Sequence, residues 1–433
     1  MKNQLQDALQ LELFPEDNSK EGKIDLSSTF ADNMSMPVHR WFRYTAGFSA
    51  NWVRELIQRE NSKYVLDPFA GSGTVPIEGE LAGVNAIGIE AHPYVYRIAC
   101  AKQNWKIDPR DFAKAAGLLL RNAKEKGITK SDFPALILKC YPLDTIQKLE
   151  ALKTAWKELD VPESHKELLW LVITAILRVS SPVGTAQWQY VLPNKTKGKV
   201  IDPFQAFELK VKDLTRDMEL LRRYYPNPAV SQIFLEDARN MCSVPDQWAD
   251  LVITSPPYAN NYDYADATRL EMTFWGDIES WGDLQEKVRQ YLVAACTQQV
   301  AHIKDQAEQI LNSPLLSVIQ PELGSVYDSL AEVRLTKGGK KNYHLMIIAY
   351  FNDLAKVMLE LRRVTKEEGK ICMVIGDSAP YGVYVPVDRW LGQLAIAAGF
   401  DSFCFEKLRD RNTKWKNRKH DVPLQEGRLW ING

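Results

Sequence analysis

The chain has 433 residues, of which 45% are hydrophobic, and its formal net charge at pH 7 is −1. This length allows one large or two modest domains with a buried core, and the composition excludes a disordered or fibrous chain. No apolar run approaches the roughly 20 residues that a membrane helix needs. Residues 1–25 are polar and acidic and lack the features of a signal peptide, so we expect a soluble, cytoplasmic protein with no membrane partner.

Cysteines, histidines and charged residues limit the kind of site further. The six cysteines form no C-x-x-C pair, which argues against a zinc ribbon or a disulfide framework, and we expect most of them to be core residues. The six histidines show no ligand spacing, so no metal is expected. Basic residues gather at 194–199, 334–341 and 407–420, which predicts either solvated loops or one localised basic face.

In chain order, residues 1–33 are expected to form a tail, and residues 34–105 to begin an α/β domain. A strand at Tyr64–Leu66 leads through a Gly-rich loop to a helix at Val75–Ala82 and then to a strand at Ala86–Ile89. A βαβ unit of this kind implies a parallel sheet.

Residues 106–230 are mostly helical in pattern and resemble an insertion into the α/β domain. The α/β pattern resumes over 231–433, with a helical excursion at 276–345. Within this part, the "KEEG" stretch at 366–369 is expected to form a turn between a long helix and a strong strand.

The Gly-rich loop "VLDPFAGSGT" predicts a nucleoside site. A nicotinamide fingerprint fails because Pro76 lies three residues after Gly73, and a phosphate loop fails because no Gly-Lys-Ser/Thr follows. The first strand ends in Asp67, the turn passes through Gly71 and Gly73, and the second strand ends in Glu90, where a carboxylate can accept hydrogen bonds from ribose hydroxyls. These features favour a nucleoside cofactor without a pyrophosphate over a Gly-rich turn that binds nothing.

These motifs carry a resemblance to a known family. "DPFAGSGT" resembles motif I of the S-adenosylmethionine-dependent amino-methyltransferases of DNA, "TSPPY" resembles their catalytic motif IV, and "VHRWFRYTAGFS" is similar to their motif X. "FLEDARN" stands where their acidic motif III turn would be, and "GKICMVIGDS" resembles a later strand of the same sheet. The resemblance covers most of the chain outside 106–230 and 276–342.

The resemblance implies a fold. It would be a class I, Rossmann-like methyltransferase with a doubly wound sheet, mostly parallel with an antiparallel edge strand, plus a mainly helical inserted domain. Residues 34–105 would then be the cofactor-binding half of the methyltransferase domain, and residues 231–433 its catalytic half.

The resemblance also implies S-adenosylmethionine as cofactor and double-stranded DNA as partner. The cofactor-binding residues would be Asp67, Phe69, Gly71 and Gly73 as the walls of the pocket, Glu90 at the ribose, Asp237 at the adenine amino group, and Phe48 and Ser49 near the methionine end. Glu236 is an alternative to Asp237.

The catalytic residues implied by the resemblance are Ser255, Pro256, Pro257 and Tyr258. The exocyclic amine of a base is a poor nucleophile, and the Ser255 side chain and the Pro256 carbonyl are acceptors for its N–H groups. The diproline fixes their geometry at low entropic cost, and Tyr258 would stack a base flipped out of the duplex. For the tetrapeptide alone, a strand-terminating turn with a surface tyrosine is the other interpretation.

Four polar or aromatic side chains follow this loop in the sequence. Tyr262, Tyr264, Arg269 and Glu271 are expected either to line the pocket or to order the loop. No cysteine follows a proline, as carbon-5 cytosine methylation would need, so we expect direct transfer to nitrogen, which depends on positioning.

The motif order resembles the family order in which target recognition lies between motifs I and IV, and this resemblance implies that 106–230 is the candidate recognition segment. In this chain the insertion precedes the acidic turn at Asp237, a departure from the family order, and 276–345 is the competing candidate. Serine before Pro-Pro-Tyr favours cytosine N4 as acceptor, with adenine N6 as the alternative. An RNA base amino-methyltransferase and a non-catalytic cofactor-binding scaffold are the rival functions. A restriction endonuclease or a defence-system partner is compatible with the resemblance.

Overall fold

The computed structural model describes residues 30–45, 47–125, 132–185, 190–411 and 422–433. The tail expected at 1–33 and the basic run at 407–420 therefore lie mostly outside the described residues. No helix among the described residues is both long enough and apolar enough to span a bilayer.

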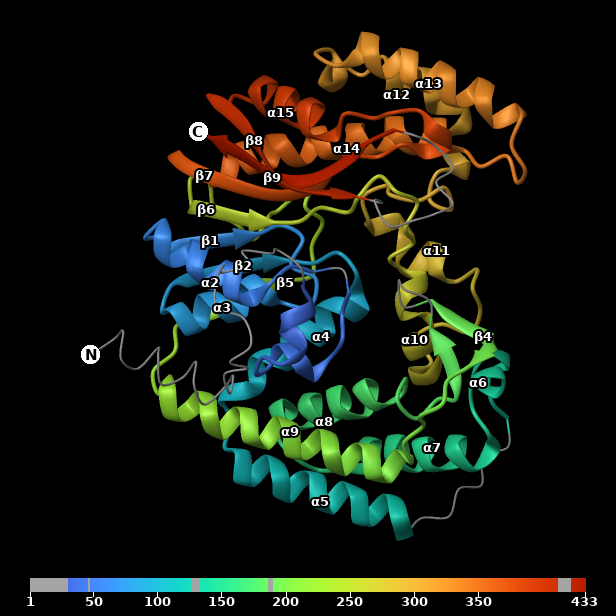
Figure 1. The fold of residues 1–433 in the computed structure, drawn as a ribbon. Helices are drawn as coiled ribbons and strands as arrows, with labels where there is room; N and C mark the ends of the chain where they lie inside the picture. The colour runs from blue at the N-terminus through green and yellow to red at the C-terminus, as the bar shows by residue number, and fades with distance from the viewer. Residues whose placement is uncertain (1–29, 46, 126–131, 186–189, 412–421) are drawn as a thin grey trace.

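The centre of the fold is a seven-stranded sheet (Figure 1). Its strands, in spatial order, are β5 (Ser231–Phe234), β2 (Asn85–Ile89), β1 (Tyr64–Asp67), β6 (Ala249–Thr254), β7 (Thr365–Gly376), β9 (Leu424–Asn432) and β8 (Ser402–Arg411). The first five strands in this order pair in parallel, and β9 pairs antiparallel with both of its neighbours. The predicted fold class, a mostly parallel sheet with an antiparallel edge, is confirmed.

Helices cover both faces of the sheet. Successive residues of a strand point to opposite faces, so a strand whose residues are all apolar needs cover on both. Val65 faces a core formed with α2 (Ala50–Arg59). The next residue, Leu66, faces a second core formed with α14 (Tyr343–Val364) and α15 (Val387–Ala397). The sheet is thus the middle of three layers, as a doubly wound fold requires.

The other α-helices of the described residues belong to the α/β part or to the two helical segments, 106–230 and 276–345. They are α3 (Thr74–Ala82), α4 (Pro93–Gln103), α5 (Pro109–Glu125), α6 (Ala135–Cys140), α7 (Leu143–Glu158), α8 (Glu163–Ile176), α9 (Pro203–Tyr224), α10 (Arg269–Trp275), α11 (Leu284–Lys287), α12 (Ala307–Leu311) and α13 (Gln320–Leu335).

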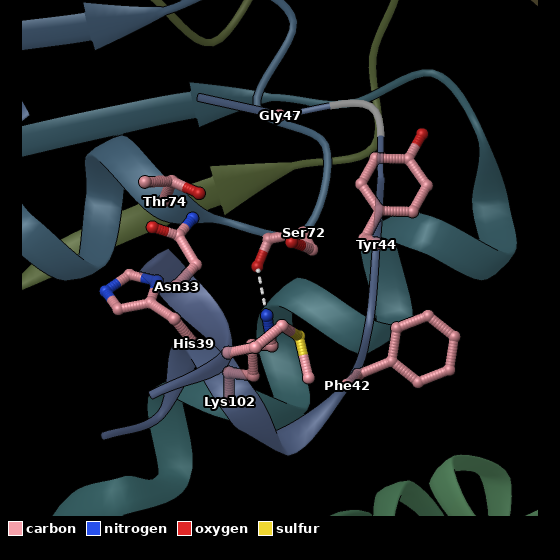
Figure 2. Close-up of a pocket in the computed structure, with 9 residues that line it drawn as sticks. Asn33, His39, Phe42, Tyr44, Gly47, Ser72, Thr74 and Lys102 are labelled. Atoms are coloured by element: carbon pink, nitrogen blue, oxygen red, sulfur yellow. Dashed lines mark hydrogen bonds between the residues drawn. The ribbon is translucent and has the colours of Figure 1, made fainter. Parts of the chain in front are cut away.

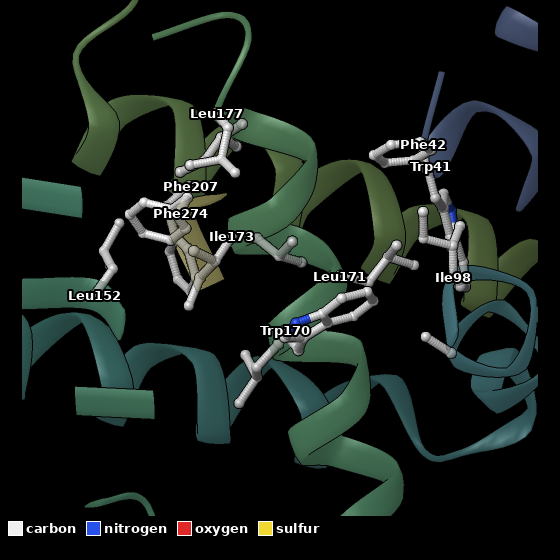
Figure 3. Close-up of a cluster of buried hydrophobic side chains, with 14 of the residues drawn as sticks. Trp41, Phe42, Ile98, Leu152, Trp170, Leu171, Ile173, Leu177, Phe207 and Phe274 are labelled. Carbon is white, nitrogen blue, oxygen red and sulfur yellow. The ribbon is translucent and has the colours of Figure 1, made fainter. Parts of the chain in front are cut away.

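A large apolar core joins the helical segment to the α/β part (Figure 3). Trp41 and Phe42, from the stretch that precedes α2, share this core with Leu171 of α8 and with Phe274 of α10. The indole N–H of Trp41 also donates to Asp217 Oδ2 of α9, at 2.8 Å. The helices of 106–230 are therefore packed against the motif X stretch and against α10, which follows the Ser-Pro-Pro-Tyr loop. The predicted domain boundaries stay a prediction.

Local predictions succeeded at the strands but failed at one turn. The strands and the helix of the βαβ unit lie where the sequence predicts them, within one residue at each end. The "KEEG" turn is wrong, because residues 366–369 lie inside β7. Thr365 pairs with Ala249 and Lys370 with Leu251, so the intervening residues form an irregularity in the ladder rather than a separate turn.

The expectation that most cysteines are core residues is half right. Cys140, Cys296 and Cys372 are buried, whereas Cys242 and Cys404 are exposed. Cys404 lies on the edge strand β8, on the face opposite to that of its neighbours Phe403 and Phe405, which pack against the core.

Candidate active site

The strand order reverses between β1 and β6, and the predicted motifs meet at this point. The chain runs from β1 outward to β2 and β5, and β6 and β7 lie on the opposite side of β1. At the carboxyl ends of the two central strands, the hydroxyl of Thr254 donates to Asp67 Oδ1 at 2.7 Å. Doubly wound sheets bind their ligands in the crevice outside such a switch point.

The Gly-rich turn lies directly against the end of β2. Gly71 and Gly73 both have positive φ angles, of 53° and 85°, and Gly73 precedes the first residue of α3. The backbone N–H of Gly71 donates to Glu90 Oε2 at 2.7 Å. Burial raises the pKa values of Glu90 and of Asp67 to about 7. The carboxylate predicted to bind a ribose is therefore next to the turn predicted to receive a nucleoside.

A pocket opens between this turn and the motif X stretch (Figure 2). It is lined by Asn33, Met34, His39, Phe42, Tyr44, Gly47, Ser72, Thr74 and Lys102. Phe48 and Ser49, which the sequence assigns to the methionine end of the cofactor, are not among these residues. Phe48 packs edge-on against Trp52 at 5.5 Å, and the Ser49 hydroxyl accepts a hydrogen bond from the Trp52 N–H as the N-cap of α2.

The lining contains residues that the sequence analysis missed. Tyr44 and Gly47 lie within the quoted motif X stretch, so a residue-by-residue search of that motif could have found them. Lys102 gave no signal, because it is a lysine near the end of an ordinary helix.

The two acidic residues after β5 are already engaged. Asp237 is half-buried, forms an ion pair with Arg239 at 2.5 Å, and accepts its backbone N–H at 2.9 Å. Glu236 accepts a hydrogen bond from the backbone N–H of Ser243 at 3.2 Å. Phe69 packs against the core on the α14 side of the sheet. The cofactor roles of Asp237 and Phe69 stay predictions.

The catalytic loop follows β6 at the same edge of the sheet. The hydroxyl of Ser255 donates to the carbonyl of Val374 on β7 at 3.1 Å. Pro256 is buried, and the ring of Tyr258 is half-buried with the Arg411 guanidinium carbon 5.2 Å from its centroid. The only proton of the Ser255 hydroxyl is therefore in use, which leaves its oxygen as an acceptor.

Asp377, directly after β7, is a further acid beside this loop that the sequence analysis did not single out. Its carbonyl accepts a hydrogen bond from Arg411 at 2.8 Å, the same guanidinium that covers Tyr258. Its Oδ2 accepts the Tyr384 hydroxyl at 3.0 Å, whereas its Oδ1 is buried and has no hydrogen-bond partner among the described residues. Burial raises the pKa of this carboxyl to about 6. The sequence signal was available, because Asp377 belongs to the quoted "GDS".

The residues after the loop divide between the two expected uses. Tyr262 and Tyr264 have ring centroids 4.4 Å apart, and the Tyr264 hydroxyl accepts the backbone N–H of Tyr258 at 3.4 Å. Glu271 is buried and paired with Arg178, and Arg269 pairs with Asp266 at 3.0 Å. The tyrosines thus lie beside the catalytic loop, whereas Arg269 and Glu271 hold the following segment in place.

The chain is similar to a DNA methylase family and to several Type II methyltransferases. A family model described as DNA methylase matches residues 3–101. A Type II methyltransferase M.BsoBI of Geobacillus stearothermophilus is 25% identical over 427 residues, covering 88% of this chain and 82% of that protein. A Type II methyltransferase M.AvaI of Nostoc sp. is 27% identical over 401 residues, covering 86% and 81%. A Type II methyltransferase M.MvaI of Kocuria varians is 23% identical over 389 residues, covering 82% and 80%.

Proposed function

The chain belongs to the DNA amino-methyltransferase family, and we propose that it transfers a methyl group from S-adenosylmethionine to the N4 amino group of cytosine in duplex DNA. The observation that carries this proposal is the Ser255 hydroxyl, which donates its proton to the carbonyl of Val374 and so presents its oxygen as an acceptor at the start of the Ser-Pro-Pro-Tyr loop. Membership of this family implies a methyl donor, and the residues at the ends of β1 and β2 fit S-adenosylmethionine.

The fit to S-adenosylmethionine rests on three features. Glu90 is an acceptor suited to ribose hydroxyls, and the turn through Gly71 and Gly73 lets a nucleoside approach the backbone closely. Lys102 contributes a buried cation to the adjoining pocket. When bound, S-adenosylmethionine supplies an electrophilic methyl group, whose bond to sulfur breaks as the amine nitrogen bonds to it.

The catalytic residues act by holding the amine in place. The Ser255 oxygen and the Pro256 carbonyl accept hydrogen bonds from its two N–H groups, which keeps the nitrogen lone pair directed at the methyl carbon. The ring of Tyr258 stacks the flipped base. The free Oδ1 of Asp377 takes the proton that the amine loses, for which a pKa of about 6 is suitable near neutral pH.

Product analysis tests the acceptor. The protein is incubated with methyl-labelled S-adenosylmethionine and, in separate reactions, a long unmodified duplex DNA or tRNA, and each nucleic acid is digested to nucleosides. We expect the label in N4-methylcytosine. Label in N6-methyladenine would assign the alternative acceptor to this site, label on tRNA alone would overturn DNA as substrate, and no label on any acceptor would favour a cofactor-binding scaffold.

A two-stranded ribbon in the helical segment is the part that we propose reads DNA. It consists of β3 (Val183–Thr185) and β4 (Val191–Thr196), and the following residues continue its basic run to Lys199. Tyr190 ties the ribbon to the catalytic segment by accepting the backbone N–H of Asp263 at 2.7 Å. Lys195 and Lys199 are exposed. A β-ribbon fits the major groove, and exposed lysines contact phosphates.

The lysines of this ribbon should carry part of the salt-dependent binding. Replacing Lys195 and Lys199 together with glutamine is expected to weaken duplex binding and to lower the slope of log K against log salt concentration by about 2. Fluorescence anisotropy with labelled duplex at several salt concentrations measures both quantities. The matched control replaces Lys337 and Lys340, which are exposed in the competing segment 276–345. A larger loss in the control pair would move DNA recognition to that segment.

We also propose a partner protein for this chain. The relatives bear the description Type II methyltransferase, which supports the proposal that a restriction endonuclease with the same recognition sequence accompanies this chain.

A further inference from the structure

Lys102 is a buried cation at the end of α4. Lys102 as a whole is 1% exposed, and its ammonium group donates to the carbonyl of Ser72 in the Gly-rich turn at 3.2 Å (Figure 2). No ion pair joins it to a carboxylate in the part of the chain that the structure describes. An ammonium has three hydrogens to donate, and one neutral carbonyl satisfies only one of them.

The buried charges near the pocket do not balance this lysine. Glu78 of α3 already accepts from Arg54 at 2.7 Å and from His39 Nε2 at 2.8 Å. Burial lowers the pKa of His39, and the charge of Lys102 lowers it further. Burial alone lowers the pKa of Lys102 to about 7. An unmatched ammonium inside a protein is costly, so its retention beside a pocket calls for an anionic partner that arrives from outside.

We propose that Lys102 binds the α-carboxylate of S-adenosylmethionine and so fixes the methionine end of the methyl donor. The inference rests on the proposed function, since it takes the methyl donor from it. The carboxylate is the only anionic group of that molecule, and the pocket that Lys102 lines begins at Ser72 and Thr74 of the Gly-rich turn. The opposite wall comes from Tyr44 and Gly47 of the motif X stretch.

This contact makes Lys102 a positioning residue. It would anchor the donor at the end away from the ribose, which Glu90 holds by its hydroxyls. Two anchors on either side of the sulfonium restrict where the methyl carbon can lie, and in-line transfer depends on that position.

The test compares a ligand that has the carboxylate with one that lacks it. Binding of S-adenosylmethionine and of decarboxylated S-adenosylmethionine is measured by calorimetry on the full chain and on Lys102→Met. The wild type should bind the first ligand at least about tenfold more tightly than the second. Lys102→Met should lose about that factor for the first ligand and remain within about twofold of the wild type for the second.

Controls separate this role from a structural one. Lys114→Met, on the exposed face of α5, should leave both affinities unchanged. The melting temperature of Lys102→Met should not fall, because the substitution removes a buried charge that has no partner. Equal weakening of both ligands, or no weakening of either, would overturn the proposal, and so would equal affinity of the wild type for the two ligands, a measurement that needs no variant.

The outcome is distinguishable from failure of the proposed function. If the wild type binds S-adenosylmethionine with the expected preference but methylates no DNA, the function fails while the role of Lys102 stands. If the wild type binds neither ligand, both are overturned.

Discussion

Replacing Tyr258 with alanine is expected to lower kcat/KM for DNA methylation by about 10- to 100-fold, with less than about a twofold change in the affinity for S-adenosylmethionine. The ring follows the diproline at the end of β6, and the Arg411 guanidinium, itself bonded to the carbonyl of Asp377, holds it in place. Its loss would remove the surface on which we propose that the flipped base stacks. The pocket beside Lys102, which we propose receives the methyl donor, contains none of these residues.

The control for this prediction keeps the ring. Tyr258→Phe retains the stacking surface and the backbone N–H that donates to Tyr264, so most of the activity should remain. Transfer is measured with labelled donor and cofactor binding by calorimetry on the same preparations. A parallel loss of cofactor affinity in Tyr258→Ala would mean that the tyrosine lies in the cofactor site rather than in the base site.

The local part of the site was predictable because each motif is a short run whose chemistry depends on its own backbone. Gly71 and Gly73 adopt the positive φ angles that a tight turn demands, and the diproline ends β6 where the sequence predicts. The βαβ pattern predicts that β1 and β2 lie in one parallel sheet, as they do. The pairing of β1 with β6, whose ends the Thr254–Asp67 hydrogen bond joins, is known from the structure alone.

The rest depended on partners distant in sequence. Lys102 reaches a carbonyl 30 residues away, and the Ser255 hydroxyl is committed to a carbonyl 119 residues away. Nothing in either local sequence indicates these partners. The "KEEG" stretch failed for a related reason, since a turn-like composition was overridden by pairing of Thr365 and Lys370 with β6.

Replacing Arg289 with methionine should lower the free energy of unfolding by about 3–5 kcal/mol, more than any other substitution considered for this chain. Arg289 and Asp263 are 2% and 6% exposed, and their side chains pair at 2.7 Å. The substitution leaves the Asp263 carboxylate in a buried site, where its remaining donors among the described residues are backbone N–H groups such as that of Ala265, at 3.2 Å. The stacking of the guanidinium over Trp281, at 4.1 Å, is lost as well.

Urea denaturation of matched variants measures this effect. Lys407→Met breaks an exposed pair with Asp410 and should cost less than about 1 kcal/mol. The double variant Asp263→Asn with Arg289→Met should recover much of the loss, because it removes both charges from the buried site. A cost for Arg289→Met as small as that of Lys407→Met would show that the carboxylate finds another partner or reaches water.

Asp263 follows the catalytic loop by five residues, and its backbone N–H donates to Tyr190, the residue before β4 of the ribbon. The same substitution should therefore weaken DNA binding at temperatures where the chain is still folded, since the segment that joins the ribbon to the catalytic loop loses its buried anchor.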